Sequence, residues 1–303
     1  MENTHIILLF YKYTKVEKPE LLFAWHKGIC EALGFKGRII IAHEGINGTL
    51  EGTEENVQKY KTLLRSIGKD PGTAGMGKFG DIEFKESVGT GSAFPKMKIK
   101  IRPEIVSLKL GEDDVDPNKI TGKHLPPQEL KKWYQNSEDF VVVDMRNGYE
   151  FNVGHFKNSI NPEMENFRDL PKVLEKLQGI KDKKVLTVCT GGVRCEKASG
   201  YLMKKGFKDV YQLHGGMHKY MEQFPGEDFL GTLYTFDNRV VMDFGGNREV
   251  VGKCFKCGSQ TERCENCANK LCNGRIICCD SCVLENGKPF CKKECEEKVL
   301  SKV

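Results

Sequence analysis

The chain has 303 residues, 39% hydrophobic and 29% charged, so it can bury a sizeable core and is not a disordered protein. Its net charge of +5 permits a nucleic-acid partner without requiring one, and no apolar run reaches the length of a transmembrane helix. The opening residues MENTHIILLFYKY lack a basic segment and a small-residue cleavage site, so we expect a strand there and no secretory signal.

The N-terminal region, residues 1–105, alternates short strand and helix patterns. Helical apolar spacing with Pro19 at its start predicts the first helix, and Thr53 with acidic residues after it predicts the cap of the second. The order strand-helix-strand-strand-helix-strand indicates a ferredoxin-like (acylphosphatase-like) α+β domain. The expected strands are 6–13, 37–42, 47–52 and 97–105, and the expected helices are 19–34 and 53–68.

The central region, residues 125–228, follows an acidic and then proline-rich linker at 111–127. Its strands are nearly continuous apolar runs, which is typical of strands buried on both faces. Alternation of these runs with helices predicts an α/β domain with a parallel sheet and helices on both faces. The expected strands are 140–145, 184–189 and 209–213, and the expected helices are 126–136, 171–178, 196–206 and 215–224.

The tail, residues 229–303, starts with a hairpin-like stretch at 233–245 and then becomes rich in cysteine. Ten of the 13 cysteines lie between Cys254 and Cys295, largely as CxxC pairs. A secreted disulfide protein more often spreads its cysteines through the fold, so this clustering indicates metal binding in a reducing cytoplasm.

Cys189 ends a predicted buried strand and opens the loop CTGGVRC, which leads into a helix. Loops at the carboxyl ends of parallel strands form the ligand crevice, and a helix start directs backbone N–H groups inward. Two glycines let this backbone curl around the sulfur, and Arg194 adds positive charge, so we expect a lowered pKa for Cys189. The alternative is a buried structural cysteine. Cys195 is either a resolving thiol or simply a small residue in the first helical turn.

The stretch DMRNGYEFNVGHFKNSINP, 45 residues upstream, resembles the signature of the rhodanese family. The matching residues are Asp144, Arg146, Glu150, Gly154, His155 and Asn161. Cys189 falls on the family's nucleophilic cysteine, and Cys195 replaces its usual Ser or Thr. The segment HGGMHKY at 214–220 is similar to the family's closing motif. The resemblance implies a catalytic Cys189 with Arg194 and Cys195 beside it.

Over about 290 residues the order of motifs resembles one rhodanese-related family, the tRNA uridine hydroxylases. FYKY, AHEGINGTL, the signature, the cysteine loop and the tail occur in its order. The resemblance implies oxygen-dependent formation of 5-hydroxyuridine at the tRNA wobble position, with tRNA as partner and molecular oxygen as co-substrate. We find no iron-binding triad and no nucleotide-cofactor motif, and a persulfide or sulfenic intermediate on Cys189 is a hypothesis.

Two other functions use the same residues. A sulfurtransferase would pass sulfur from thiosulfate or from a sulfur-donor protein through Cys189. A binding module would use the scaffold alone and would need an inert Cys189, which the intact cysteine and Arg194 argue against. The extra N-terminal region and the tail favour a macromolecular substrate.

Candidate substrate-binding residues come from three segments, 43–47, 144–146 and 191–192, and a basic strand is a further candidate. The turn at 42–50 either presents side chains to the substrate or merely connects two strands through its glycines. Lys96, Lys98, Lys100 and Arg102 alternate along a strand, where they either follow a phosphate backbone or form a solvated face. The expected substrate-binding residues are Asp144, Arg146, Gly191, Gly192, His43, Glu44 and Asn47.

The tail cysteines suit two structural zinc ions, because tetrahedral zinc takes four thiolates and leaves no open position. A first ion would be held by Cys254, Cys257, Cys279 and Cys282. A second would be held by Cys267, Cys272, Cys291 and Cys295. Cys264 and Cys278 would then be spare. The tail has few apolar residues, so we expect it to need metal to fold.

Overall fold

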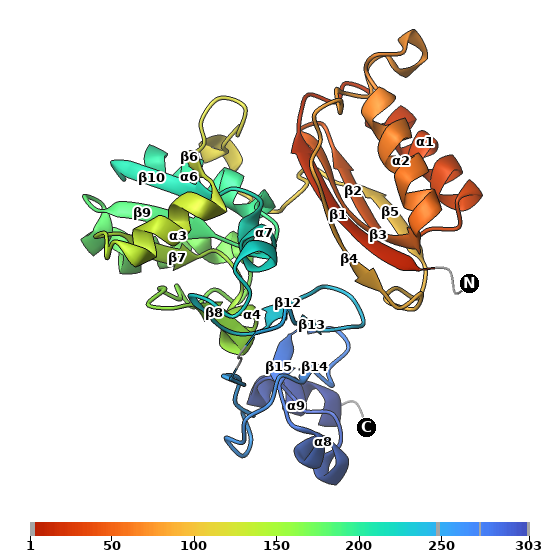
Figure 1. Cartoon of the computed structure of the whole chain (residues 1–303). Coiled ribbons are helices and arrows are strands. Elements are labelled where there is room, and N and C mark those ends of the chain that lie inside the picture. Colours follow the sequence, from red (N-terminus) through yellow and green to blue (C-terminus); the bar gives the residue numbers. More distant parts are fainter. Residues whose placement is uncertain (1–3, 247–248, 273, 302–303) are drawn as a thin grey trace.

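The computed structural model describes residues 4–246, 249–272 and 274–301. Figure 1 shows the N-terminal region, the central region and the tail as separate bodies around a common centre. None of the helices in the described part of the chain combines the length and the apolar character needed to cross a membrane.

The N-terminal region is a sheet with two helices packed on one face. Strands β1 and β3 pair antiparallel along their full length, and β2 pairs antiparallel with β3. Alternate residues such as Leu8, Phe10 and Leu50 point to the helices and form a core with Leu22 and Tyr60. The elements are β1 (His5–Tyr13), α1 (Pro19–Ala32), β2 (Lys36–Ala42), β3 (Gly45–Thr53), α2 (Glu54–Ser66), the 3-10 turn η1 (Pro71–Thr73), β4 (Phe84–Gly89) and β5 (Met97–Ile101).

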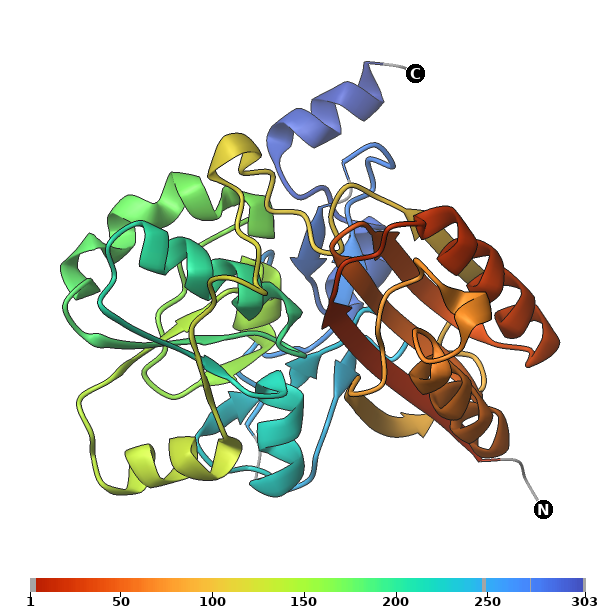
Figure 2. The ribbon, with the colours of Figure 1, turned by 90° about the horizontal axis from the view of Figure 1, so that it is seen from above.

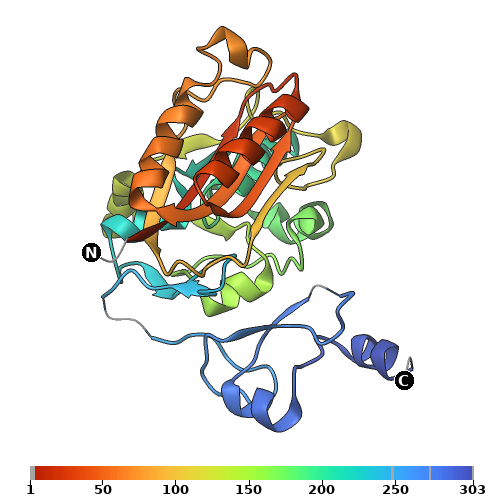
Figure 3. The same ribbon diagram turned by 90° about the vertical axis from the view of Figure 1, so that its right-hand side faces the viewer.

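The ferredoxin-like order is confirmed, but its last strand is not the one expected. The sheet runs β4-β1-β3-β2-β5, so β4 occupies the edge beside β1 that closes the ferredoxin-like unit. The basic strand β5, expected in that role, is an added strand parallel to β2 at the opposite edge. As a result, Lys98 lies beside Arg38 on the helix-free face. Figure 3 views the sheet from its helical side.

The central region has the predicted parallel sheet, in the order β6-β10-β9-β7. Strand β6 lies inside the segment expected to be a linker. The elements are η2 (Gly111–Asp113), β6 (Lys123–Leu125), α3 (Pro127–Gln135), β7 (Val141–Asp144), α4 (Gly148–Val153), β8 (Gly154–Phe156), η3 (Phe167–Asp169), α5 (Leu170–Val173), η4 (Leu174–Ile180), β9 (Lys184–Val188), α6 (Val193–Lys204), β10 (Asp209–Leu213) and α7 (Gly216–Gln223).

Helices cover both faces of this sheet, as predicted. One core joins β7 and β9 to α6 through residues such as Val143, Val185 and Leu202. The other core joins the sheet to α3 and α7, for example through Leu130 and Met217. The helix expected at 171–178 is broken: a short α5 passes into the 3-10 segment η4.

The tail contains the expected hairpin and a small cysteine-rich unit. Strand β11 pairs with β8 of the central region, and the hairpin β12–β13 follows. The hairpin β14–β15 packs on α4 through Ile277 and Cys264, which meet Val153. The elements are β11 (Phe229–Gly231), β12 (Leu233–Tyr234), β13 (Val241–Met242), β14 (Cys264–Asn266), β15 (Arg275–Ile277), α8 (Asp280–Asn286) and α9 (Lys293–Leu300).

A buried lysine ties the N-terminal and central regions together. The Lys197 amino group, on α6, lies 2.8 Å from Glu44 and 2.9 Å from Glu104. Since Lys197 is fully buried, its charge must be compensated by these carboxylates. The helix-free face of the N-terminal sheet therefore faces the carboxyl ends of the central strands, as Figure 2 shows from above.

Candidate active site

Cys189 lies immediately after β9, where the chain turns into α6. The Gly192 backbone N–H donates a hydrogen bond to the Cys189 sulfur at 3.2 Å. Gly192 has a φ of 103°, and a Cβ there would lie 2.8 Å from the Tyr11 hydroxyl. A glycine is therefore required both by the backbone conformation and by the approach of the N-terminal region.

The start of α7 packs against the cysteine loop and bonds its backbone carbonyls. The backbone N–H groups of Met217 and His218 donate to the carbonyls of Cys189 and Thr190 at 2.9 and 3.1 Å. A Cβ on Gly216, whose φ is +69°, would lie 2.6 to 2.7 Å from those same two carbonyl oxygens. The segment HGGMHKY therefore acts as a support for the cysteine loop.

The environment of Cys189 favours its thiolate. Burial acts to raise its pKa, but the Cys195 thiol, the Arg194 charge and the backbone N–H groups of residues 194 and 195 lower it, to about 6. Burial raises the pKa of Cys195 well above the usual thiol value, and the neighbouring Cys189 adds to this rise. Cys195 is therefore the neutral hydrogen-bond donor of the pair.

Arg194 is paired differently from what we expected. Its guanidinium makes two 2.8 Å hydrogen bonds to the Glu150 carboxylate and a 3.3 Å hydrogen bond to the Thr190 hydroxyl. Sequence reasoning placed Arg194 beside the sulfur without this partner. The ion pair fixes Arg194 against the loop, where its charge still lowers the pKa of Cys189.

Asp144 and Arg146 form a second buried ion pair. Arg146 donates to both Asp144 oxygens, at 3.0 and 2.7 Å, and to the Gly154 carbonyl at 2.6 Å. Their exposed fractions are 1% and 0%, and neither lines the cavity above Cys189. This placement suits support of the fold better than the substrate contact expected from the sequence.

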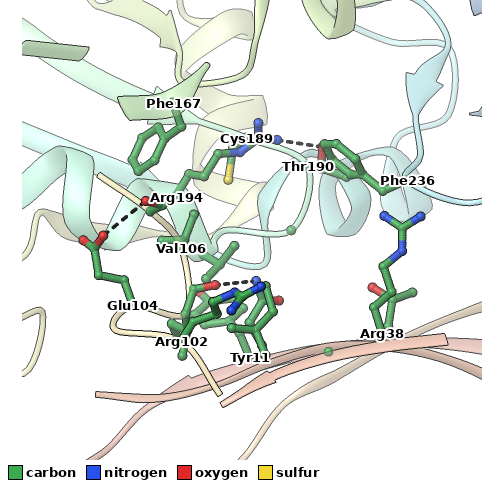
Figure 4. A pocket seen from close by; sticks show the side chains of 18 of the residues that line it. Tyr11, Arg38, Arg102, Glu104, Val106, Phe167, Cys189, Thr190, Arg194 and Phe236 are labelled. Atoms are coloured by element: carbon green, nitrogen blue, oxygen red, sulfur yellow. Dashed lines mark hydrogen bonds between the residues drawn. The ribbon is translucent and has the colours of Figure 1, made fainter. Parts of the chain in front are cut away.

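A cavity of about 770 Å³ opens above Cys189, between the helix-free face of the N-terminal sheet and the central region. Figure 4 shows Cys189, Thr190 and Arg194 on one side, and Tyr11, Arg38 and Arg102 on the other. Its lining residues include Leu9, Tyr11, Arg38, Asn47, Arg102, Glu104, Val106, Asn147, Phe167, Cys189, Thr190, Gly191, Val193, Arg194 and Phe236. The exposed surface of Cys189 itself is close to zero, so a reactant must enter this cavity to reach it.

Of the expected substrate residues, His43 and Glu44 lie in the turn between β2 and β3, whereas Asn47 lies within β3. Asn47 lines the cavity, and its amide also donates to the Ile105 carbonyl at 3.1 Å. Glu44 accepts from the Ile105 backbone N–H and pairs with Lys197, so it joins two regions of the chain. His43 bonds the Val16 carbonyl and does not line the cavity. Of the loop glycines, Gly191 lines it and Gly192 supplies the N–H to sulfur.

Sequence reasoning missed the aromatic walls of the cavity. Tyr11 comes from β1, Phe167 from the segment before α5, and Phe236 from the tail hairpin. Tyr11 is held by Glu196, which accepts from its hydroxyl at 3.2 Å and also bonds His124 at 2.9 Å. The segment FYKY contained Tyr11, but no local pattern links it to residues almost two hundred positions away.

The basic strand lies at the edge of the cavity. Lys98 pairs with Arg38 and Lys100 with Ile40 across β5 and β2, which puts their side chains on the cavity side of the sheet. Arg38 and Arg102 line the cavity itself. The row of charges is therefore continuous with the cavity mouth.

The tail cysteines gather in the pairing expected from the sequence. Within the described residues, the two groups each have sulfurs within 4.8 Å of one another. They are Cys254, Cys257, Cys279 and Cys282, and Cys267, Cys272, Cys291 and Cys295. Cys264 instead packs beside Val153, and Cys278 is buried with its sulfur 4.0 Å from that of Cys254.

Comparisons with known proteins agree with this architecture. Residues 5–105 match the UPF0176 acylphosphatase like domain, 126–223 the rhodanese-like domain and 230–296 the rhodanase C-terminal family. A tRNA uridine(34) hydroxylase of Cytophaga hutchinsonii is 44% identical over 96% of this chain and 89% of its own. Proteins of that name from Bacillus licheniformis and Bacillus cereus are 45% and 43% identical, covering 92% and 95% of this chain and 84% and 88% of theirs.

Proposed function

We propose that this chain, which belongs to the tRNA uridine(34) hydroxylase family, hydroxylates the wobble uridine of tRNA to 5-hydroxyuridine. Molecular oxygen is the co-substrate in this proposal, and Cys189 is the catalytic residue. The observation that carries it is the cavity above the Cys189 sulfur.

The size and lining of this cavity suit a nucleoside. A volume of about 770 Å³ is in the range of small-molecule sites and far exceeds the needs of a thiosulfate ion. Enzymes that modify a base take it out of its stack and hold it between aromatic and apolar side chains. Tyr11, Phe167 and Phe236 offer such walls, while Arg38 and Arg102 are placed to meet the flanking phosphates.

We infer that the Cys189 thiolate acts as a nucleophile toward the uracil ring. Addition at C6 would form the sulfur–C6 bond, break the C5–C6 double bond and move its electron pair toward C5 and O4. C5 would then be the nucleophilic carbon that bonds to one atom of O2. The other oxygen atom would leave as water, with two electrons and two protons from an external thiol reductant that becomes a disulfide. Loss of the C5 proton would then break the sulfur–C6 bond and release the Cys189 thiolate. The pKa of about 6 supports this role, because most of Cys189 is thiolate at neutral pH.

A sulfurtransferase remains the second candidate. The Gly192 N–H that reaches the Cys189 sulfur would also stabilise a persulfide anion there. Such an enzyme would need a sulfur donor, either thiosulfate or a donor protein. The size of the cavity favours the nucleoside over thiosulfate.

For the tail we propose two structural zinc ions. Each group offers four sulfurs within 4.8 Å of one another, which fits a closed tetrahedral site without a position for substrate. Zinc bound there would supply folding energy to the tail and would take no part in the reaction. Reduced thiols at these sites and a tRNA substrate together suit a cytoplasmic location.

Nucleoside analysis of tRNA from cells that lack the gene tests the hydroxylase. Wild type should restore 5-hydroxyuridine and Cys189→Ser should not, while Cys30→Ala, in the core of the N-terminal region, serves as the matched control. Restoration by Cys189→Ser would refute the role of Cys189. A thiosulfate–cyanide assay on the same proteins tests the second candidate.

Exchange of the C5 hydrogen of the target uridine with solvent tests the nucleophilic step. Reversible addition at C6 allows C5 to take up a solvent proton, so exchange should occur without oxygen and require Cys189. If the enzyme hydroxylates the uridine but shows no such exchange, the addition step is contradicted and the proposed hydroxylation still stands.

A further inference from the structure

A second cavity, of about 780 Å³, lies between the central region and the tail. It is separate from the cavity above Cys189, and the proposed chemistry does not use it. The charged residues that line it are Glu163, Glu165, Arg168, Lys253, Arg275 and Lys292. The wall on the tail side includes Cys272 and Cys291 of the second cysteine group.

The two cavities are neighbours that share one wall. Asn147 lines both of them. An aromatic series runs along the same partition: Phe236 faces the first cavity, Tyr149 faces the second, and Tyr234 lies between them with ring centroids 5.2 Å from each. The two cavities therefore adjoin at this wall.

The second cavity carries uncompensated positive charge. Glu165 pairs with Lys292 at 3.5 Å, and Glu163 pairs with Lys176. Arg168, Lys253 and Arg275 pair with no carboxylate among the residues that the structure describes. A site of this charge favours an anionic ligand.

The polar and aromatic groups around it fit a nucleotide. Asn152, Asn161 and Asn166 bring amide groups that can both donate and accept hydrogen bonds. Phe255 is 50% exposed at the wall, and Tyr149 is half-buried. Single-stranded RNA is recognised by such combinations, with bases stacked on aromatic rings or on guanidinium planes and with basic residues near the phosphates.

We propose that the second cavity binds a nucleotide adjacent to the target uridine in the single-stranded anticodon loop. This inference rests on the proposed function and extends it, because it gives the tail a direct part in substrate recognition. The target base occupies the cavity above Cys189, and its neighbour passes the Asn147 partition and enters the second cavity. The second cysteine group holds the wall that carries Arg275 and Lys292.

A double-mutant cycle between protein and RNA tests whether the second cavity binds the flanking nucleotide. The protein variant is Arg168→Ala with Lys253→Ala, which removes two exposed charges, and the control is Lys132→Ala with Lys208→Ala, which removes two charges away from both cavities. The RNAs are an anticodon stem-loop with the target uridine and two copies that lack the base on one or the other side of it. Dissociation constants are measured at fixed salt, and the alkylation rate of Cys189 reports that the site is intact.

We expect the loss of one flanking base to weaken binding to wild type and to the control about ten-fold, as for a stacked base. The same loss should have little effect on the Arg168/Lys253 variant, because without these two charges the flanking nucleotide is no longer held where its base can stack on Phe255. A flanking 4-thiouridine should also cross-link to a peptide that contains Tyr149 or Phe255. Equal losses in all three proteins, or no loss in wild type, would overturn the inference. Failure of wild type to prefer this stem-loop over an unrelated hairpin would overturn the proposed function instead.

Discussion

The Arg194 guanidinium makes two parallel hydrogen bonds, each of 2.8 Å, to the Glu150 carboxylate, which is fully buried. Arg194 lies in the first turn of α6, directly after the cysteine loop, and Glu150 lies in α4, 44 positions earlier. The pair therefore joins the cysteine loop to the segment that resembles the rhodanese signature.

Removal of one partner of this pair should lower the free energy of unfolding more than removal of both partners. Arg194→Met leaves the Glu150 carboxylate buried without a counter-charge, so we expect the free energy of unfolding to fall by about 3–5 kcal/mol. Glu150→Gln combined with Arg194→Met removes both charges of this pair, so the double variant should be more stable than Arg194→Met alone. Urea unfolding measures both, and a double variant as unstable as the single one would contradict this.

The pH dependence of Cys189 alkylation should show a midpoint near 6, because only the thiolate reacts. Cys195→Ala removes the thiol that donates to Cys189, so we expect the midpoint to rise by about one pKa unit. Cys195→Ser keeps a donor and should stay near the wild-type value. Mass spectrometry of the Cys189 peptide after brief iodoacetamide treatment gives the profile, and a wild-type midpoint above 8 would exclude the proposed thiolate.

Gly216 and Gly206 make a matched pair for testing the support of the cysteine loop. Both have positive φ, of +69° and +91°, but only at Gly216 would a Cβ meet the carbonyls of Cys189 and Thr190. Gly216→Ala should therefore lose about 1–3 kcal/mol more stability than Gly206→Ala, because it adds a steric clash to the same backbone strain. Gly216→Ala should also change the alkylation rate of Cys189, and Gly206→Ala should not. Equal effects of both variants would mean that α7 does not position the loop.

Local patterns predicted most strands and helices of this fold, but they failed where contacts with distant segments determine which side chains are buried. Strand β4 was missed because Lys85 occupies a buried position, which breaks the expected alternation of apolar and polar residues. Lys85 is placed over the Tyr11 ring, 5.2 Å from its centroid, and burial lowers its pKa to about 8. That position is compatible with lysine only because of a partner from another strand.

The candidate site was predictable in the same uneven way. Cys189 and its glycines lie in one contiguous loop, so the sequence marked them as candidates once the upstream segment that resembles the rhodanese signature was added. The Glu150 partner of Arg194 and the aromatic walls from β1 and the tail come from distant segments. Cysteine grouping in the tail was predictable because short CxxC turns bring thiolates together with few alternatives.

Metal analysis should find two zinc ions per chain in protein purified under reducing conditions. Cys282→Ser should lose one of them, because it removes one of four ligands from the first group. Cys264→Ser is the control, since Cys264 packs beside Val153 outside both groups and should retain both ions. Chelation should unfold the tail, visible as new protease cleavage after residue 250, while the N-terminal and central regions stay intact. Loss of metal from Cys264→Ser would contradict the grouping.

The basic row on β5 should contribute to tRNA binding through phosphates. Lys98→Glu with Lys100→Glu reverses two exposed charges beside Arg38, and Lys27→Glu with Lys59→Glu reverses two on the opposite, helical face. Each phosphate contact that is lost should reduce the slope of log K against log salt by about 0.7–0.9, so we expect the β5 variant to bind tRNA more weakly and with a flatter salt dependence. Both variants change the net charge equally, so a general electrostatic effect would weaken the tRNA binding of both to the same extent. Only a greater loss in the β5 variant, measured at several salt concentrations, supports a phosphate path that leads along this strand to the cavity mouth.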